Sequence, residues 1–518
     1  MPLRTRLQAG GALAKMMLTP FERPDRLPRS LRAMAPWGSS MAGLVAGAAA
    51  RYPDRIGIVD ETSSTTYREL WRRSQAIAAE LRSLGIEHGS RVGLLARNRL
   101  GFVEAMTAVD ALGADLVLLN TGFAGPQLAD VVESEGIEAI VHDDEFTDAV
   151  ASCGARLTID ENALEDMTRS GTVAPPEHAG RVIILTSGTT GRPKGAARSN
   201  DEGDLEAVAA VIERIPLRLG DTQVVAAPMF HSWGLSHLLL GLARSATNVV
   251  ARRFDPERTL AAVAAHRARV LVVVPVMMSR ILDLDPAVLR RHATPDLRVI
   301  ASSGSAIGSG LVTRITDHFG PVLYNLYGST EVAVATIATP DDLSIDPGTA
   351  GRVVLGSRVE ILDVDGAPLP DGEVGRIFVG SAMPFGGYTN GGDKERVRGL
   401  LSSGDMGRFH DGLLFVEGRD DDMIVSGGEN VFPAEVEELL RAHPAIADAA
   451  VIGADDDEFG QALAAFVVTE PDAELTASQV RDHVRGHLAR HKVPRTVAFI
   501  DELPRNATGK LLRRELDV

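Results

Sequence analysis

Residues 185–195 gather the groups that a phosphate-binding loop needs. These eleven residues include four hydroxyls, three glycines and the cations Arg192 and Lys194. Hydroxyls, backbone N–H groups and positive charge can converge on one polyphosphate, and glycine lets the backbone approach it closely. The stretch is not a Walker loop, because Gly195 rather than Ser or Thr follows Lys194. We therefore expect a different kind of polyphosphate site here; the alternative is a solvated turn of ordinary composition.

Four further groups of polar residues follow, at 327–331, 403–405, 418–422 and 504–510. They contain, among others, Tyr327, Glu331, Asp405 and Lys510. An ionised carboxylate offers two acceptor oxygens, and Mg²⁺ prefers carboxylate and phosphate oxygens. Taken singly, each residue has an ordinary structural explanation, such as a core tyrosine, a carboxylate at a helix start or a solvated lysine. The five groups together indicate one nucleotide site.

In this order the five motifs resemble those of the adenylate-forming superfamily, which includes acyl-CoA synthetases, luciferases and peptide-synthetase adenylation domains. The resemblance runs from about residue 50 to the C-terminus. It implies that a carboxylate attacks the α-phosphate of ATP, which gives an acyl-adenylate and pyrophosphate. Because one anion must approach another, fixed cations and N–H donors are needed at the developing charge. Local cations must supply them: Arg192, Lys194, Arg419 and Lys510.

The resemblance also implies roles for single residues around the nucleotide. Lys194 and the loop before it would bind the β- and γ-phosphates, Tyr327 would stack on adenine, and Asp405 would accept the ribose hydroxyls. Thr330 would bond to the α-phosphate, and Glu331 would hold Mg²⁺. The run 302–306 matches the adenine-side loop, with Ser303 where relatives often carry glycine. The implied ATP- and AMP-binding residues are Thr186, Ser187, Gly188, Thr189, Thr190, Gly191, Lys194, Ser303, Gly304, Ser305, Tyr327, Gly328, Ser329, Asp405 and Arg419.

The resemblance implies a catalytic role for Lys510 and a hinge role for Asp421. Lys510 would lie between the carboxylate and an α-phosphate oxygen and stabilise the transition state. The C-terminal domain would turn about the hinge residue Asp421 after adenylation and withdraw Lys510. The turn would present Gly427 and Gly428 to the pantetheine arm of CoA, since glycine lets that arm pass close to the backbone. The acidic run at 420–422 could otherwise be a solvated linker.

Residues 228–234 follow an apolar run where the family places the acyl pocket. His231 is a candidate catalytic residue that would orient the carboxylate or gate the tunnel, although a packed histidine is nearly as common. Trp233 and Gly234 are candidate acyl-pocket residues, and with 276–278 they suggest an apolar tail site. Relatives that activate amino acids carry an aspartate near here; the corresponding stretch offers His231 and Trp233 instead. The pattern therefore disfavours an amino acid as substrate.

Short β-branched runs alternate with amphipathic stretches from 91 to 328, and this pattern predicts βαβ units with parallel strands. Strands are expected at 91–95, 115–120, 182–186, 224–228, 270–275, 297–301 and 322–326, and helices at 257–268 and 311–318. We expect an α/β fold, with a large N-terminal domain of parallel βαβ sheets and a small β subdomain, followed by a small mobile α+β C-terminal domain. The predicted boundaries are an arm at 1–40, an adenylation domain at 41–418 with its β subdomain at 351–416, and a C-terminal domain at 419–518.

Composition limits the partners. The chain has 518 residues and a formal net charge of −17, which argues against nucleic acid as a bulk partner. The single Cys153 excludes an intramolecular disulfide and favours a reducing, cytoplasmic compartment. No run of about 18 apolar residues predicts a transmembrane helix; 102–119 comes nearest. The basic arm could contact an anionic membrane weakly, but its irregular apolar spacing favours a partly docked arm.

These observations together predict an ATP-dependent, AMP-forming acyl-CoA ligase acting on a medium- or long-chain fatty acid, with ATP, Mg²⁺ and CoA. Three alternatives stay open. The acyl group could pass to a carrier protein; the acid could be an aryl or steroid acid; or the chain could bind a nucleotide or acyl group without catalysis. Retention of Lys194, Glu331, Asp405 and Lys510 disfavours the last. The sequence leaves chain length and oligomeric state open.

Overall fold

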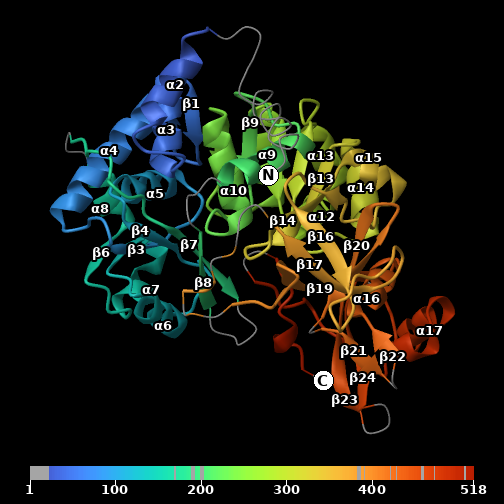
Figure 1. Cartoon of the computed structure of the whole chain (residues 1–518). Helices are drawn as coiled ribbons and strands as arrows, with labels where there is room; N and C mark the ends of the chain where they lie inside the picture. The colour runs from blue at the N-terminus through green and yellow to red at the C-terminus, as the bar shows by residue number, and fades with distance from the viewer. Residues whose placement is uncertain are drawn as a thin grey trace.

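The computed structural model of the chain describes residues 23–167, 171–187, 193–198, 203–381, 385, 387–389, 391, 393–420, 422–426, 429–456, 460–471, 473–506 and 509–517. Two large sheets form most of the molecule (Figure 1). The six-stranded sheet has the order β6-β5-β3-β4-β7-β8, and all neighbours pair in parallel except β7 and β8. Its strands are β3 (Arg91–Leu95), β4 (Asp115–Leu118), β5 (Ala139–His142), β6 (Leu157–Ile159), β7 (Val182–Ser187) and β8 (Pro193–Arg198).

The second large sheet has nine strands in the order β15-β14-β13-β12-β11-β9-β10-β1-β2. Pairing is parallel from β13 to β1 and antiparallel at both edges. Its strands are β1 (Ile56–Val59), β2 (Ser64–Thr66), β9 (Thr222–Val225), β10 (Thr247–Val250), β11 (Val270–Val273), β12 (Val299–Ser302), β13 (Leu323–Ser329), β14 (Ala333–Ala338) and β15 (Arg352–Val353). Every neighbour between β13 and β1 is parallel because a helix returns the chain before the next strand, as the alternating pattern predicts.

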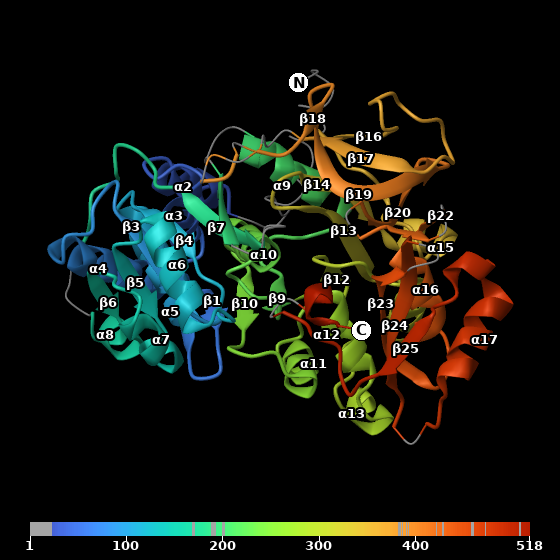
Figure 2. The ribbon, with the colours of Figure 1, turned by 90° about the horizontal axis from the view of Figure 1, so that it is seen from below.

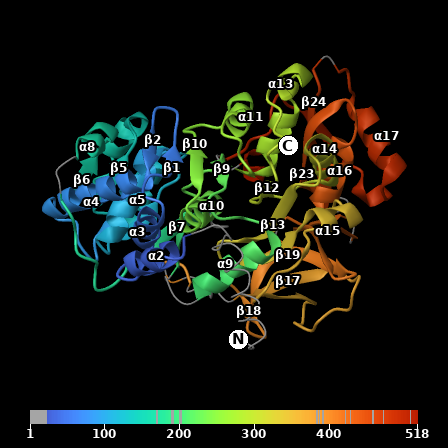
Figure 3. The same ribbon diagram turned by 90° about the horizontal axis from the view of Figure 1, so that it is seen from above.

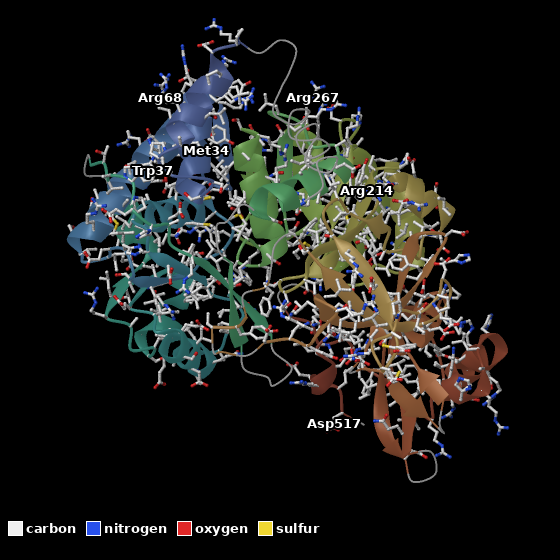
Figure 4. All side chains as sticks on the ribbon, viewed as in Figure 1. Met34, Trp37, Arg68, Arg214, Arg267 and Asp517 are labelled. Atoms are coloured by element: carbon white, nitrogen blue, oxygen red, sulfur yellow. The ribbon has the colours of Figure 1, made fainter. Side chains whose placement is uncertain are left out.

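Helices cover both sheets; most of them share one large core, and a second core lies on the other face of the six-stranded sheet. On the side of the six-stranded sheet lie α2 (Arg26–Met34), α3 (Met41–Arg51), α4 (Tyr67–Ser83), α5 (Leu100–Ala111), α6 (Gly125–Glu135), α7 (Thr147–Ala151) and α8 (Glu161–Asp166). The nine-stranded sheet carries α9 (Gly203–Arg214), α10 (Ser232–Ala243), α11 (Pro256–Ala265), α12 (Pro275–Leu282), α13 (Pro286–Arg291), α14 (Ser309–Phe319) and α15 (Pro340–Ile345). Met34 and Trp37 lie where α2 meets the body of the molecule (Figure 4), and Trp37 meets Trp71 of α4 edge to face at 5.2 Å.

A smaller antiparallel sheet follows the nine-stranded sheet along the chain. It consists of β16 (Arg358–Leu362), β17 (Gly375–Gly380), β18 (Arg396–Val397), β19 (Leu400–His410) and β20 (Leu413–Arg419). Val353 of β15 belongs to the nine-stranded sheet, while β20 runs on to Arg419. The sheet is therefore offset by several residues from the span predicted for a β subdomain, and the three predicted domain boundaries stay predictions.

The C-terminal part has its own sheet and core. Strands β21 (Ile424–Ser426), β22 (Glu429–Val431), β23 (Ile446–Asp456), β24 (Gly460–Thr469) and β25 (Thr496–Phe499) are covered by α16 (Pro433–Arg441) and α17 (Ala477–His487). Short 3₁₀ turns occur at Arg490–Lys492 and Arg513–Glu515. Beyond β25 the chain runs back toward α12 (Figures 2 and 3). The arrangement confirms the predicted α/β class and the small α+β end.

Three predicted strands end earlier than expected. The strand predicted at 115–120 stops at Leu118 and the one at 224–228 stops at Val225. The one at 270–275 stops at Val273, because Pro275 begins α12. Proline has no N–H for a central strand but suits the first turn of a helix. The apolar stretch 102–119 divides into α5 and β4. Among the residues described, no helix combines the length and the apolarity needed to cross a bilayer.

Candidate active site

One cavity of about 2480 Å³ brings most of the predicted site residues together. It lies between the nine-stranded sheet, the antiparallel sheet and the C-terminal part. The predicted residues that line it are His231, Trp233, Gly234, Ser303, Gly304, Ser305, Tyr327, Gly328, Ser329, Thr330, Glu331, Asp405, Arg419 and Lys510. Segments up to 280 residues apart in the chain therefore meet at one place, as the five motifs predict.

The phosphate loop is described only at its two ends. Thr186 and Ser187 end β7, Lys194 lies near the start of β8, and the backbones of Thr186 and Lys194 pair across the two strands. The described ends of the loop thus pair as antiparallel strands at the end of a parallel strand, where ligands of such sheets bind. The remaining predicted residues of this loop, Gly188, Thr189, Thr190 and Gly191, lie outside the described residues, as do Asp421, Gly427 and Gly428.

Tyr327, Asp405 and Arg419 form a hydrogen-bonded group on the cavity wall. The Tyr327 hydroxyl donates to Asp405 Oδ2 at 2.6 Å, and Arg419 Nη1 lies 3.4 Å from Asp405 Oδ1. Asp405 and Arg419 face each other because they pair across β19 and β20. Burial raises the pKa of Asp405, against the hydrogen bond from Tyr327 and the charges of Arg419, Lys394 and Lys510. Burial also raises the pKa of Tyr327, so this hydroxyl remains a donor at neutral pH.

Glu331 is held by two hydroxyls. Tyr388 donates to Oε1 at 2.9 Å and Ser329 donates to Oε2 at 2.9 Å. The turn that carries Glu331 is tight: a Cβ on Gly328 would lie 1.9 Å from the carbonyl oxygen of Ala333, so only glycine fits there. Ala333 itself has a φ of 58°, which is uncommon for a residue other than glycine. The strained turn directs the Glu331 carboxylate into the cavity.

Among the described residues, the carboxylates of the cavity wall, such as Glu331 and Asp405, form no larger metal-binding cluster. Within the described part of the chain, no group of three or more His, Cys, Asp or Glu residues could hold a metal ion. Mg²⁺ is commonly bound by one or two carboxylates together with substrate phosphates. Glu331, exposed to the cavity and hydrogen-bonded through both oxygens, fits that use.

The adenine-side loop is tied to its neighbouring strand through Ser303. Its hydroxyl donates to the carbonyl of Leu326 at 2.9 Å, which joins the end of β12 to β13. Gly304 has a φ of 98°, a conformation that favours glycine. Serine at 303, where relatives often carry glycine, is therefore explained by a structural hydrogen bond that leaves the loop backbone facing the cavity.

Lys510 reaches the cavity on a loop with an internal framework. Lys510 N donates to Asn506 Oδ1 at 2.9 Å, and Arg505 Nη1 donates to the Gly509 carbonyl at 2.8 Å. A Cβ on Gly509 would lie 2.2 Å from Val276 Cγ1, so the loop packs directly on α12. The charge of Lys510 also lowers the pKa of Asp405, which places the two groups near one another. The C-terminal part is thus oriented with Lys510 at the nucleotide pocket.

Two residues at the site were missed by the sequence analysis as functional residues. Lys394 donates from Nζ to the carbonyl of Ser403 at 3.0 Å and lines the cavity beside Asp405. Tyr388 is the partner of Glu331 described above. Neither lies in one of the five motifs, so spacing gave no signal for either. A basic residue nine positions before the 403–405 motif is the only sequence hint for Lys394.

The three acyl-pocket candidates differ in their contacts. Trp233 and Gly234 pack against neighbouring backbone, and His231 faces the cavity. The Trp233 indole N–H donates to the Val273 carbonyl at 3.0 Å, and a Cβ on Gly234 would lie 2.3 Å from the Pro228 carbonyl oxygen. Both residues therefore fix α10 against the strand ends. His231 directly precedes α10 and lines the cavity, and burial lowers its pKa to about 4. At neutral pH His231 can give a carboxylate one N–H hydrogen bond but no positive charge.

His237 makes the stability of this region depend on pH. It is fully buried against Trp233, and burial lowers its pKa from 6.5 to about 3. Below pH 6.5 the unfolded chain binds a proton there that the folded chain does not, so stability present above pH 6.5 is lost as the pH falls. We expect a loss of about 1.4 kcal/mol per pH unit from this group between pH 6.5 and about 3.

Chemical denaturation at pH 7, 6 and 5 measures this slope. In the variant His237→Leu, the free energy of unfolding is expected to fall less steeply with decreasing pH than in the unmodified chain. The exposed His410, replaced by Leu, should leave the slope as it is. Equal slopes for His237→Leu and the unmodified chain would contradict the assignment.

A hydrogen bond joins the C-terminal part to α14. Both the backbone N–H of Ser309, at 3.0 Å, and the Ser309 hydroxyl donate to Glu438 Oε1. If the C-terminal part turns between two half-reactions, as the resemblance implies, this contact would belong to the orientation described here. Glu438→Ala is then expected to slow acyl-adenylate formation about 2- to 5-fold, in line with an exposed contact. Conversion of supplied acyl-adenylate into thioester should not slow.

Single-turnover measurements of the two half-reactions test this prediction. Glu474→Ala, at an exposed position of the same part of the chain, is the matched control. If Glu438→Ala slowed both half-reactions to the same extent, the contact would have no preference for the adenylate-forming orientation.

Known proteins resemble this chain over almost its whole length. The profile of the family described as AMP-binding enzyme matches residues 45–389, and that of the AMP-binding enzyme C-terminal domain matches residues 435–510. The 2-succinylbenzoate–CoA ligase of Bacillus cereus (strain ATCC 14579) is 31% identical over 471 residues, which cover 90% of this chain and 95% of the relative. The enzyme of the same name from Geobacillus sp. (strain WCH70) is 30% identical over 482 residues, covering 90% and 94%.

Solved structures agree with the fold. The o-succinylbenzoate CoA synthetase of Bacillus subtilis, in complex with the acyl-adenylate intermediate OSB-AMP, has a TM-score of 0.81 at 28% identity. The match covers 91% of this chain and 97% of that one. The amide bond synthetase McbA of Marinactinospora thermotolerans has a TM-score of 0.81 at 26% identity, with 93% and 99% covered. The five motifs and the architecture thus lead to the same group of proteins.

Proposed function

The chain belongs to the AMP-binding enzyme family, whose members among its relatives are adenylate-forming CoA ligases, and from this premise we propose that its acid substrate is an aromatic carboxylic acid. The reaction class is that of an AMP-forming acid–CoA ligase, which uses ATP, Mg²⁺ and CoA. The observation that carries the proposal is the 31% identity, across 90% of the chain, to a ligase named for an aryl acid.

In the first half-reaction a carboxylate oxygen forms a bond to the α-phosphorus of ATP, and the bond to pyrophosphate breaks. Lys510 would offset the negative charge that develops between the two anions, at the place where its loop meets the cavity. Asp405 would accept the ribose hydroxyls, and Tyr327 would lie against adenine. Glu331 would hold Mg²⁺, which neutralises phosphate charge when it is bound.

In the second half-reaction the CoA sulfur bonds to the acyl carbon, AMP leaves, and the thiol proton passes to solvent. The hinge role of Asp421 and the pantetheine role of Gly427 and Gly428 remain proposals carried by the resemblance. His231, neutral and facing the cavity, would orient the substrate carboxylate through an N–H hydrogen bond. We assign it no acid–base step, because burial keeps it uncharged.

The aromatic acid proposed here replaces the fatty acid that the sequence motifs alone predicted. Those motifs describe the nucleotide and the catalytic loop, which all members share, and they do not contact the variable part of the acid. The relatives support the aryl alternative instead, and their names as CoA ligases support CoA over a carrier protein as acceptor. They offer nothing for the predicted contact with a membrane.

Release of AMP, measured with CoA present across aromatic, aliphatic and steroid acids, tests the proposal. We expect aromatic acids to have the highest kcat/KM. A clear preference for straight-chain acids would return the assignment to fatty acids. Nucleotide binding without AMP release from any acid would leave a binding protein that has lost catalysis.

A further inference from the structure

The cavity has an arm that none of the nucleotide roles uses. It runs along one face of α10, where Ser236, Leu239 and Ala243 line it at positions i, i+3 and i+7. All three are only half-buried, whereas residues on the opposite face of α10, such as Leu238 and Leu242, are fully buried. The arm is continuous with the part of the cavity that His231 and Trp233 line. A substrate held by its carboxylate near His231 can therefore extend along α10.

The outer wall of this arm comes from the N-terminal helices. Leu27, Leu31 and Met34 of α2 lie on one helical face and line the arm, together with Leu44 and Gly47 of α3. The helices α2, α3 and α10 lie side by side in all the ribbon views (Figures 1 to 3), and α3 contacts α10. A Cβ on Gly47 would lie 3.1 Å from Ser30 Oγ, so α2 is packed closely on α3. Helix α2 precedes residue 45, where the match to the family profile begins.

The arm is uncharged along its described lining. On α2, α3, α9 and α10, none of the described residues that line it is Asp, Glu, Lys or Arg. The cations of the cavity, such as Lys394, Arg419 and Lys510, lie on the nucleotide side. The Ser236 hydroxyl is already donated to the Trp233 carbonyl at 3.0 Å. A carboxylate at the end of a substrate tail would lose water along this lining and meet no cation there, which is strongly unfavourable. The arginines of α2, Arg26, Arg29 and Arg32, do not line the cavity.

The arm is also longer than one aromatic ring. The lining positions on α10 run from Ser232 to Ala243, twelve residues, which span about 17 Å at the rise of an α-helix. The far end is open, because Leu31 is 53% exposed although it lines the arm. An exposed leucine at the mouth of an apolar groove suits contact with an apolar ligand.

We propose that the acid carries an elongated, uncharged tail, that this tail lies between α10 and the α2–α3 pair, and that α2 limits how far it extends. The inference rests on the proposed ligase function and deepens it. It separates this chain from its named relatives, because 2-succinylbenzoate carries a second carboxylate. The substrate class is an aromatic acid with an apolar substituent pointing away from the reacting carboxylate.

Two matched acid series test the tail itself. In 4-alkylbenzoates of increasing chain length, kcat/KM for AMP release is expected to rise until the arm is filled. The same acids ending in a carboxylate should be at least about 10-fold poorer, a difference of about 1.4 kcal/mol. Equal values in both series, or a preference for the charged ends, would overturn the proposal.

Two variants test the walls. Ala243→Phe fills the far end of the arm and is expected to lower the ratio of kcat/KM for octylbenzoate over benzoate about 10-fold. Leu31→Lys places a cation at the mouth of the arm. The kcat/KM for acids with a carboxylate-ended tail should therefore rise, and the kcat/KM for acids with an alkyl tail should fall. Controls are Ala264→Phe on α11, half-buried and outside the cavity lining, and Leu84→Lys, 42% exposed at the end of α4.

The outcomes keep the two proposals apart. If no aromatic acid releases AMP, the proposed function fails. If benzoates react but tail length, tail charge and both wall variants have no effect on their ratios, the ligase assignment stands and the tail inference is wrong. Because Leu31 is largely exposed, Leu31→Lys gives this answer even if Ala243→Phe does not fold.

Discussion

Replacement of Lys510 by alanine is expected to slow acyl-adenylate formation by about 100- to 1,000-fold, the usual effect of removing one group that stabilises charge in a transition state. Lys510 lines the nucleotide cavity, and its charge acts on Asp405. Its loop is braced by Asn506 and Arg505, so truncating the side chain should leave the backbone in place. The lost rate therefore reports the missing ammonium group.

Pyrophosphate exchange measures the first half-reaction, and thioester formation from supplied acyl-adenylate measures the second. We expect Lys510→Ala to slow exchange about 100- to 1,000-fold and to spare the second reaction. Lys492→Ala is the matched control, since Lys492 lies in the same part of the chain and pairs with Glu435 outside the cavity lining. Equal losses in both half-reactions would mean that one orientation of the C-terminal part serves both steps.

Replacement of Asp405 by asparagine is the second change for which we expect a large effect. Its carboxylate accepts from Tyr327 and faces Arg419, and in the proposed function it also receives the ribose hydroxyls. An amide keeps the shape but loses the charge, which leaves Arg419 without this counterion. Hydrogen bonds to a charged group contribute about 1.5–3 kcal/mol. We therefore expect the KM for ATP to rise about 10- to 100-fold.

Isothermal titration with ATP, beside steady-state kinetics, checks this prediction. The KM for the acid should change far less than the KM for ATP, because the tail arm lies away from Asp405. Asp411→Asn, in the turn between the same two strands and 89% exposed, is the control. If the affinity for ATP were unchanged in Asp405→Asn, the ribose would have to bind elsewhere.

The nucleotide side of the site was predictable because its residues come in short contiguous motifs. Tyr327 to Glu331 span one strand end and its tight turn, and Arg505 and Asn506 hold Gly509 and Lys510 through hydrogen bonds. Each motif keeps its internal geometry through local hydrogen bonds, such as Ser329 to Glu331. The order of the motifs in the sequence is therefore enough to identify these residues, and the structure shows that the motifs meet around one cavity.

Residues outside the motifs could not be predicted in the same way. Tyr388 reaches Glu331 across 57 positions, and Lys394 lies beside Asp405 through its bond to Ser403. Both depend on how the antiparallel sheet folds over β13. Trp233 and Gly234, predicted for an acyl pocket, line the cavity and also fix α10 against the strand ends, a packing role that the sequence did not reveal.

The substrate arm was beyond sequence reasoning for a physical reason. Its walls come from helical faces in α2, α3 and α10, which lie about 200 positions apart and carry only ordinary apolar residues. Such faces are also what any packed helix presents to a core. The half-buried side chains of Ser236 and Ala243 are what distinguish the arm, and exposure is known only once the helices are in place.

The contact between Gly509 and Val276 has a consequence for the order of events. With that loop seated on α12, the reacting end of the cavity is capped from the C-terminal side. In the proposed function, the acid and the nucleotide would bind before the loop packs on α12, and the thiol would enter only after the loop has moved away. The lifetime of the mixed anhydride would then depend on how fast the contact of this one glycine is broken.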